Sequence, residues 1–288
     1  MKLLRYGAPG QEKPGLLDDN GHIRDLSGHM SDITPSCLDP VNLARLAALD
    51  TQSLPRVGNH PRLGVPVTSI GKIVAIGLNY VDHAAEANLP IPREPLVFLK
   101  ATSSLSGPTD PIVLPKESSK GDWEVELGIM IGRRTSHVGS DDALRHVAGY
   151  CVVNDVSERE YQFDRGGSWD KGKGCDTFGP VGPWLVTADE VPDPQSLDLW
   201  LDVNGKRMQT GNTKNMIFGC AKLVSYVSRF MSLLPGDLII TGTPPGVGMG
   251  KKPAPVFLKP GDVMSLGISG LGEQRQDVHA WNPREDRQ

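Results

Sequence analysis

Glycine and proline interrupt most of this chain at short intervals, and this feature limits what the chain can fold into. The 288 residues include 33 glycines and 24 prolines. Together they make up about a fifth of the sequence, compared with about 12% in average proteins. Both residues favour turns, and proline has no backbone N–H for a helix interior or a central strand. The sequence therefore predicts short strands joined by many turns, and it argues against a helical bundle.

The first 70 residues have the pattern of a small α/β module. Asn20-Gly21 supplies a tight hairpin turn between two short strands. Leucines at positions 43, 46 and 49 have helical spacing. The expected elements are strands at 2–6, 15–17 and 22–26, a helix at 40–49 and a linker at 55–66. We therefore expect a small N-terminal domain over residues 1–70 and a second domain over 71–288.

The remainder of the chain reads as strand, turn and strand with few helices. Apolar residues with a period near 3.6 predict one clear helix, over 213–230. The expected strands lie at 72–76, 96–99, 112–114, 123–131, 148–153, 238–241 and 263–268. This pattern indicates a β-rich second domain.

The net charge, the apolar runs and the cysteines indicate which binding partners and which cellular compartment to expect. Lys and Arg total 30 and Asp and Glu total 34, so a net charge of −4 gives no basic field for nucleic acid or anionic lipid. Apolar runs such as Leu238–Ile240 fall far short of the ~18 residues that a membrane helix needs. The four cysteines have no CxxC spacing and fit reduced, buried thiols. We expect a cytoplasmic protein that binds neither nucleic acid nor membranes.

Two glutamates in the segment 123–131 are candidate metal ligands. Side chains alternate along a strand, so Glu124 and Glu126 point to one face, roughly 6–7 Å apart. The opposite face carries Val125, Leu127, Ile129 and Ile131. Carboxylates this close repel each other unless a cation lies between them, and their oxygens select Mg²⁺, Mn²⁺ or Ca²⁺ over zinc. The alternative is a solvent-exposed face of an amphipathic strand.

A third acidic residue, Asp155, ends the apolar strand over 148–153. Ser157–Glu160 has the pattern of a capping box that opens a helix. On such a helix Arg159 and Gln162 would lie on the side of Asp155 and would suit an anionic, oxygen-rich substrate. The alternative is an ordinary helix cap with an Asp–Arg ion pair.

His83 and Glu86 are candidates for a catalytic base and its partner. Three residues apart on a predicted helical turn, the carboxylate can hold one imidazole nitrogen and leave the other free to take a proton from water. A histidine near the start of a helix can equally be a surface residue.

The glycine-rich segment 241–251 does not match a nucleotide-binding loop. A P-loop needs glycine where Pro245 stands and Ser or Thr where Lys252 stands. A Rossmann turn needs a helix directly after the glycines, which the prolines and glycines exclude. A rigid loop that offers Thr243 to a ligand is the better interpretation.

In order along the chain, these motifs resemble the fumarylacetoacetate hydrolase family over residues 71–281. The matching segments are Gly77–Tyr80 with His83 and Glu86, Phe98–Lys100, Glu124 with Glu126, Asp155 with Arg159 and Gln162, Lys173–Pro180, Pro235–Asp237 and Thr241–Pro244. Residues 205–213 and 244–248 look like the bacterial branch of 2,4-diketo acid and sugar-acid enzymes.

The resemblance implies an α+β, β-rich fold, in which a mixed β-sheet roll forms the catalytic domain, and a homodimer or homotetramer. It also implies a bound Mg²⁺ or Mn²⁺ ion. The implied metal ligands are Glu124, Glu126 and Asp155, the implied catalytic residues are His83, Glu86 and Lys173, and the implied substrate-binding residues are Arg159, Gln162 and Thr243.

The expected function is hydrolysis of the C3–C4 bond of an acylpyruvate-like 2,4-diketo acid, with release of pyruvate and a second acid. The resemblance favours a 2,4-diketo-3-deoxy sugar acid, such as the fuconate or rhamnonate derivative. Decarboxylation, isomerisation or ureidoglycolate cleavage at the same site are the alternatives. A metal-dependent sugar-acid binding protein without catalytic activity is a further alternative.

Overall fold

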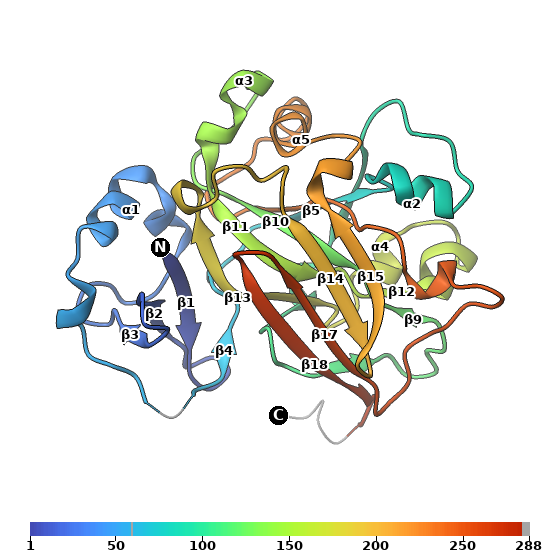
Figure 1. The fold of residues 1–288 in the computed structure, drawn as a ribbon, viewed down its shortest axis with the longest axis horizontal. Coiled ribbons are helices and arrows are strands. Elements are labelled where there is room, and N and C mark those ends of the chain that lie inside the picture. The colour runs from blue at the N-terminus through green and yellow to red at the C-terminus, as the bar shows by residue number, and fades with distance from the viewer. Residues whose placement is uncertain (59, 284–288) are drawn as a thin grey trace.

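The computed structural model describes residues 1–58 and 60–283. Most of its regular structure is in strands, which form one large sheet, one five-stranded sheet and one small ribbon. The helices are short and lie at the edges of these sheets (Figure 1). The predicted α+β, β-rich class is confirmed.

The large sheet runs through the whole molecule and is mixed. Most of its neighbouring strands are antiparallel, but β16 is parallel to β5 and β7 is parallel to β13. In order across the sheet, its main path consists of β3 (Ile23–Asp25), β2 (Lys13–Leu17), β1 (Lys2–Tyr6), β13 (Gly179–Thr187), β11 (Val147–Asn154), β10 (Val125–Ile131), β16 (Leu238–Ile240), β5 (Ile73–Gly77) and β6 (Leu96–Lys100). Off this path, β4 (Leu63–Gly64) pairs with β1 and β7 (Leu105–Ser106) with β13.

The five-stranded sheet packs against one face of the large sheet. It consists of β15 (Lys206–Asn212), β14 (Asp198–Val203), β17 (Val263–Ile268), β18 (Gly272–Ala280) and β8 (Ile112–Leu114). The ribbon pairs β12 (Ser157–Glu158) with β9 (Gly121–Asp122). Leu127 and Ile129 of β10 share one buried core with Leu201 of β14 and Leu266 of β17. The predicted apolar face of segment 123–131 is therefore confirmed.

The helices join and flank these strands. The α-helices are α1 (Pro40–Ala47), α2 (Val81–Glu86), α3 (Ser140–Ala143), α4 (Asp170–Lys173) and α5 (Cys220–Val227). Short 3₁₀ helices lie at Pro35–Leu38, Thr51–Ser53, Thr102–Ser104, Leu144–His146, Ala188–Glu190, Thr213–Asn215 and Gly248–Gly250. No helix in the described part of the chain is both long and apolar enough to span a membrane.

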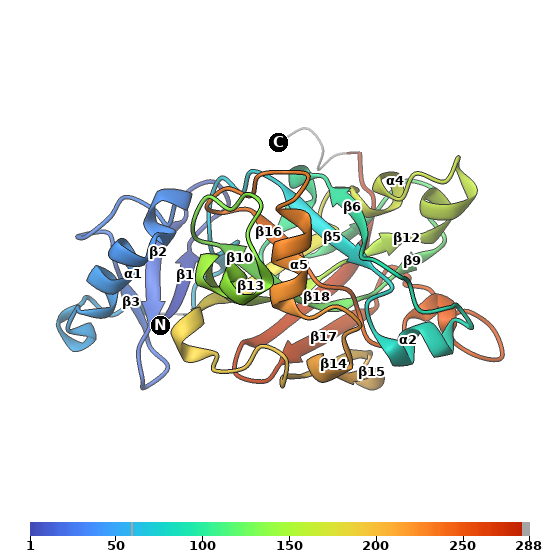
Figure 2. The ribbon, with the colours of Figure 1, turned by 90° about the horizontal axis from the view of Figure 1, so that it is seen from above.

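Residues 1–70 continue the large sheet. Strand β1 pairs with β13, with Leu3 opposite Leu185. Leu3 and Ile33 also share a second core with Met130 and Cys151 of the central strands. Figures 1 and 2 place these residues at one end of the molecule, and α2 and α4 at the other. The expected boundary at residue 70 thus lies within one continuous sheet.

The predicted helix over 213–230 is wrong in its first half. Helix α5 begins only at Cys220, and Gly219 before it is extended. Contacts with the turn after β5 explain the difference. Ile217 N donates to Asn79 O, and Phe218 N donates to the Asn79 side chain, both at 2.8 Å. These tertiary hydrogen bonds override the helical period of the sequence.

The four cysteines are all free thiols, as expected. Cys151 and Cys220 are buried, and burial raises the pKa of each to about 12. Cys37 and Cys175 are partly exposed, so the expectation of buried thiols is wrong for these two.

Candidate metal centre and active site

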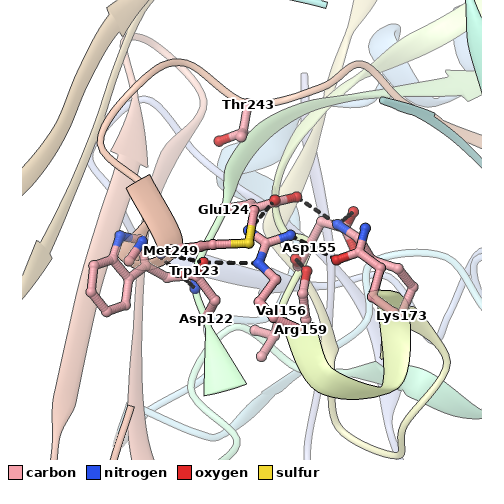
Figure 3. Close-up of polar contacts among 12 residues, drawn as sticks. Asp122, Trp123, Glu124, Asp155, Val156, Arg159, Lys173, Thr243 and Met249 are labelled. Carbon is pink, nitrogen blue, oxygen red and sulfur yellow. Dashed lines mark hydrogen bonds and ion pairs between the residues drawn. The ribbon is translucent and has the colours of Figure 1, made fainter. Parts of the chain in front are cut away.

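Three carboxylates meet where β10 begins and β11 ends. Glu124 precedes β10 and Asp155 follows β11 (Figure 3). Glu126 lies within β10. The antiparallel register pairs Val125 with Asn154, so Asp155 N donates to Glu124 O at 2.9 Å. One oxygen from each carboxylate lies within 4.8 Å of the others. All three side chains are buried, so the alternative of a solvent-exposed acidic face is wrong.

The chemistry of this cluster fits a divalent cation. All three donors are carboxylates, the ligand type that Mg²⁺ and Mn²⁺ favour over zinc. Burial raises the pKa of Glu126 well above its ordinary value, and the charges of Asp155 and Glu124 raise it further. Asp155 Oδ1 lies 2.8 Å from Lys100 Nζ but has no partner in hydrogen-bonding geometry. The cluster therefore fits a divalent-metal site, and one oxygen of Asp155 accepts no hydrogen bond.

Two buried lysines balance part of this negative charge. Lys173 Nζ, from α4, donates to Glu124 Oε2 and to Asp155 Oδ2, each at 2.6 Å. Lys100, at the end of β6, donates to the backbone oxygens of Val156 and Lys173 and pairs with Asp155. Burial raises the pKa of Glu124, but the charges of Arg159 and Lys173 outweigh it and lower this pKa to about 2. Glu124 is therefore ionised.

Arg159 and Gln162 face the cluster, but the predicted capping box is wrong. Ser157 belongs to strand β12, and its hydroxyl donates to Asp155 O. A π-helical turn follows over Glu160–Asp164. The Arg159 guanidinium donates to Gln162 Oε1 at 2.9 Å and to Glu124 Oε1 at 2.5 Å. The ribbon and the turn, rather than a regular helix, bring these side chains to the site.

His83 and Glu86 form the expected pair on α2. The distance from His83 Nδ1 to Glu86 Oε2 is 3.2 Å. The Glu86 carboxylate also accepts from Gly246 N, at 3.1 and 3.0 Å to its two oxygens. Burial acts to raise the pKa of Glu86, but the hydrogen bonds from His83 and Gly246 N outweigh it, so this pKa lies below its ordinary value. The ionised Glu86 thus holds His83 against the glycine-rich loop.

A cavity of about 540 Å³ brings the predicted residues together. Its lining includes His83, Glu86, Glu124, Glu126, Arg159, Gln162, Lys173 and Thr243. Asp155 is fully buried next to this lining, in contact with Lys173. A metal site and a candidate base therefore open into one cavity.

Thr243 lines this cavity, but its hydroxyl is engaged within the protein. Thr243 Oγ1 donates to Val125 O at 2.9 Å and accepts from Gln209 Nε2 at 2.8 Å. A hydroxyl has one proton, so this side chain can only accept a further hydrogen bond. In its predicted substrate-binding role, Thr243 can therefore act only as a hydrogen-bond acceptor.

The glycine-rich loop after β16 is fixed to the metal site through Gly242. Its backbone N–H donates to Glu126 Oε2 at 2.7 Å. Gly242 has a φ of +90°, and a Cβ there would lie 2.8 Å from Asn79 Cβ. Only glycine satisfies both constraints without rearrangement, which explains this glycine between two threonines.

The residue-by-residue reading of the sequence missed Asp122. This buried carboxylate accepts from Arg159 Nε at 2.9 Å, and from Gly248 N and Met249 N at 2.6 and 3.0 Å. It therefore fixes Arg159 and the glycine-rich loop relative to each other (Figure 3). Asp122 lies two residues before Glu124, and only this closeness to the Glu pair could have drawn attention to it.

Replacing Asp122 with asparagine is expected to lower kcat/KM by about 10- to 100-fold, the usual effect of losing a group that orients site residues. Asparagine keeps the shape but loses the charge that holds Arg159. We expect the effect mainly in KM, with Mg²⁺ affinity retained, as measured by steady-state kinetics and calorimetry. Asp142→Asn, at an exposed ion pair with Arg145, is the control. Unchanged kinetics for Asp122→Asn would contradict this role.

Comparison with known proteins identifies relatives along almost the whole chain. Residues 72–279 match the family model described as fumarylacetoacetate (FAA) hydrolase C-terminal. A Burkholderia multivorans relative is 64% identical over 280 residues, which cover 97% of this chain and 99% of the relative. Its name gives only a provisional assignment as a hydrolase and no substrate.

Two solved structures have the same fold. A fumarylacetoacetate hydrolase from Exiguobacterium antarcticum matches with a TM-score of 0.85 and 34% identity, over 98% of this chain and 100% of that chain. Maleylpyruvate hydrolase from Sphingobium sp. SYK-6, solved with manganese(II) and pyruvate, matches with a TM-score of 0.81 and 31% identity over the same shares of the two chains.

Proposed function

The chain belongs to the fumarylacetoacetate hydrolase family, and we propose that it hydrolyses the C3–C4 bond of an acylpyruvate-like 2,4-diketo acid. The products are pyruvate and a second acid. The observation that carries this proposal is that the Glu124–Glu126–Asp155 site and the His83–Glu86 pair open into one cavity. The manganese and pyruvate in the Sphingobium hydrolase support it.

The metal site is assigned to the carboxylate end of the substrate. Mg²⁺ or Mn²⁺, held by Glu124, Glu126 and Asp155, would supply Lewis acidity toward the carboxylate and 2-keto oxygens. Arg159 and Gln162 face the same end, where a guanidinium and an amide can hold a carboxylate. Lys173 contributes positive charge to this end, where negative charge develops as pyruvate leaves as its enolate.

His83 is assigned to water activation. Its Nδ1 is held by Glu86, so Nε2 can take a proton from a water molecule that attacks the 4-keto carbon. Glu86 fixes the orientation of the ring and stabilises its protonated form. The proton on His83 is then available to the departing pyruvate carbon.

A screen that follows pyruvate release, substrate loss and ligand binding, with and without chelator, tests this function. The substrates are acylpyruvates, 2,4-diketo-3-deoxy sugar acids, oxaloacetate, a hydroxymuconate-type diene and ureidoglycolate. We expect Mg²⁺-dependent pyruvate release from a 2,4-diketo acid with one equivalent of the second acid. Turnover of oxaloacetate, the diene or ureidoglycolate alone would contradict hydrolysis in favour of a decarboxylase, isomerase or lyase. Binding without any turnover would indicate a binding protein.

A further inference from the structure

We propose that the natural substrate carries an extended apolar acyl group at C4, and that Phe163 and Trp169 recognise it. This inference rests on the proposed function and selects among its substrates. It departs from the sugar-acid derivative that the resemblance favours. The sequence motifs contain the residues at the reactive end of the cavity. The structure also shows the apolar side chains that line the rest of it.

An aromatic row leads from the reactive end of the cavity to its exposed side. The Phe98 ring lies 5.3 Å from Lys173 Nζ, which contacts the metal-site carboxylates. Trp169 packs edge-on against Phe98, with ring centroids 5.2 Å apart, and against Phe163, at 5.8 Å. All three rings line the cavity, and Phe163 is 42% exposed. A substrate held at Lys173 would therefore extend along apolar surface.

Phe98, Trp169 and Phe163 form an apolar wall of the cavity, and other large apolar side chains extend it. Leu89, Leu96 and Met249 line the same cavity and are each at least 40% exposed. Exposed apolar groups gathered around a cavity mark a surface that binds an apolar partner. The cavity is therefore built to bury hydrocarbon next to its charged end.

The backbone at the end of β5 is shaped around this wall. A Cβ on Gly77 would lie 2.6 Å from the Trp169 ring, so glycine is needed for the ring to lie against the strand. The next residue, Leu78, has a φ of +48°, a conformation that favours glycine. The chain nevertheless places a leucine there, and Leu78 lines the cavity. Its apolar side chain in an unfavourable backbone conformation supports a role in contacting ligand.

The same wall does not suit a polyhydroxylated chain. Each buried hydroxyl needs a hydrogen-bond partner, and burying one without a partner is costly. Apart from the metal-site carboxylates, Arg159, Gln162, Lys173, Thr243 and the His83–Glu86 pair, the polar side-chain groups among the described residues of the cavity lining are the Lys252 amine and the Trp169 indole N–H. A sugar chain would leave most of its hydroxyls unpaired there, whereas a terminal carboxylate would depend on Lys252.

Binding of 2-oxo acids that lack the 4-keto group tests this inference without requiring cleavage. We would titrate the Mg²⁺-loaded protein by calorimetry with pyruvate, 2-oxohexanoate, 2-oxooctanoate, 2-oxoadipate and 2-keto-3-deoxygluconate. Among the six-carbon acids, 2-oxohexanoate is expected to bind most tightly. Each added methylene is expected to lower Kd about two- to fourfold, as burial of hydrocarbon predicts. Tighter binding of 2-keto-3-deoxygluconate or 2-oxoadipate, or no gain with chain length, would overturn the inference.

Variants in the aromatic row separate recognition from folding. Phe163→Ser is expected to weaken 2-oxooctanoate binding about tenfold and to leave pyruvate binding unchanged. Phe230→Ser is the matched control, since Phe230 is 55% exposed and is not part of the cavity lining. Trp169→Leu provides a second variant with the same expected pattern. Equal loss for pyruvate and 2-oxooctanoate would show a structural role and contradict the assignment.

The two proposals fail in different ways. If acylpyruvates are cleaved but chain length brings no affinity, the apolar acyl group is wrong and the hydrolase stands. If affinity rises with chain length but no 2,4-diketo acid is cleaved, the reaction is wrong and the apolar wall stands.

Discussion

Replacing Glu126 with glutamine is expected to abolish the response of this protein to divalent cations and to lower kcat/KM at least about 10³-fold, since Lewis-acid stabilisation is worth several kcal/mol. Glutamine has the same shape and can still accept the hydrogen bond from Gly242 N. It lacks the negative charge that an oxygen-ligated cation requires. The measurements are the Mg²⁺-induced shift of the melting temperature and pyruvate release.

The same substitution should hardly affect the metal-free protein. Burial and the adjacent Asp155 and Glu124 charges raise the pKa of Glu126 well above its ordinary value, so the metal-free fold gains little from a negative charge at this position and a neutral amide can replace it. We therefore expect a metal-free melting temperature within about 2 °C of the parent. Glu273→Gln, at an exposed position on β18, is the control. A Glu126→Gln protein that Mg²⁺ still stabilises would contradict the assigned ligand set.

Replacing His83 with alanine is expected to lower kcat by about 10²- to 10⁴-fold, the range for losing a general base. The metal ligands are untouched, so the Mg²⁺-induced rise in melting temperature should remain. Single-turnover kinetics combined with thermal melts would separate these two properties. His279→Ala changes an exposed histidine at the end of β18 and is expected to leave both unchanged. Full turnover by His83→Ala would remove His83 as the base.

The pH dependence of kcat/KM gives a second test of this pair. Burial acts to raise the pKa of Glu86, but its hydrogen bonds with His83 and Gly246 outweigh this and hold it below the ordinary 4.5. Its stabilising contribution is therefore present above about pH 4.5 and is lost as the pH falls through the lower folded value. Glu86→Gln should remove this acid-side loss from the pH profile, because glutamine has no carboxyl group that titrates.

The sequence predicted the metal centre well because the relevant information is local. Alternation along one strand places Glu124 and Glu126 on one face, and an apolar strand that ends in an acid identifies Asp155. The antiparallel register then brings the two segments together. The spacing of His83 and Glu86 was likewise sufficient to predict their contact.

Residues that act through long-range contacts were not predictable in this way. Asp122 binds Arg159 and loop backbone that lies 126 residues further along the chain. Gln209 reaches Thr243 and Val125 from the second sheet. No periodicity or spacing encodes such contacts, because they depend on how the two sheets pack.

The same limitation explains the errors in the fold. Strand β13, which lies between β1 and β11, is missing from the strands expected from the sequence. It begins with Gly179-Pro180 and contains Gly182-Pro183, residues that favour turns. The segment expected to be a linker contains β4, which pairs with β1. In both cases the sheet supplies partners that local propensity does not reveal.

The most direct test of the central claim is anomalous X-ray diffraction from crystals grown with Mn²⁺. The account predicts a single strong manganese peak within coordination distance of Glu124, Glu126 and Asp155, on the side of the cavity that His83 faces. A peak bound elsewhere, or carboxylates that remain without manganese at saturating concentration, would contradict it.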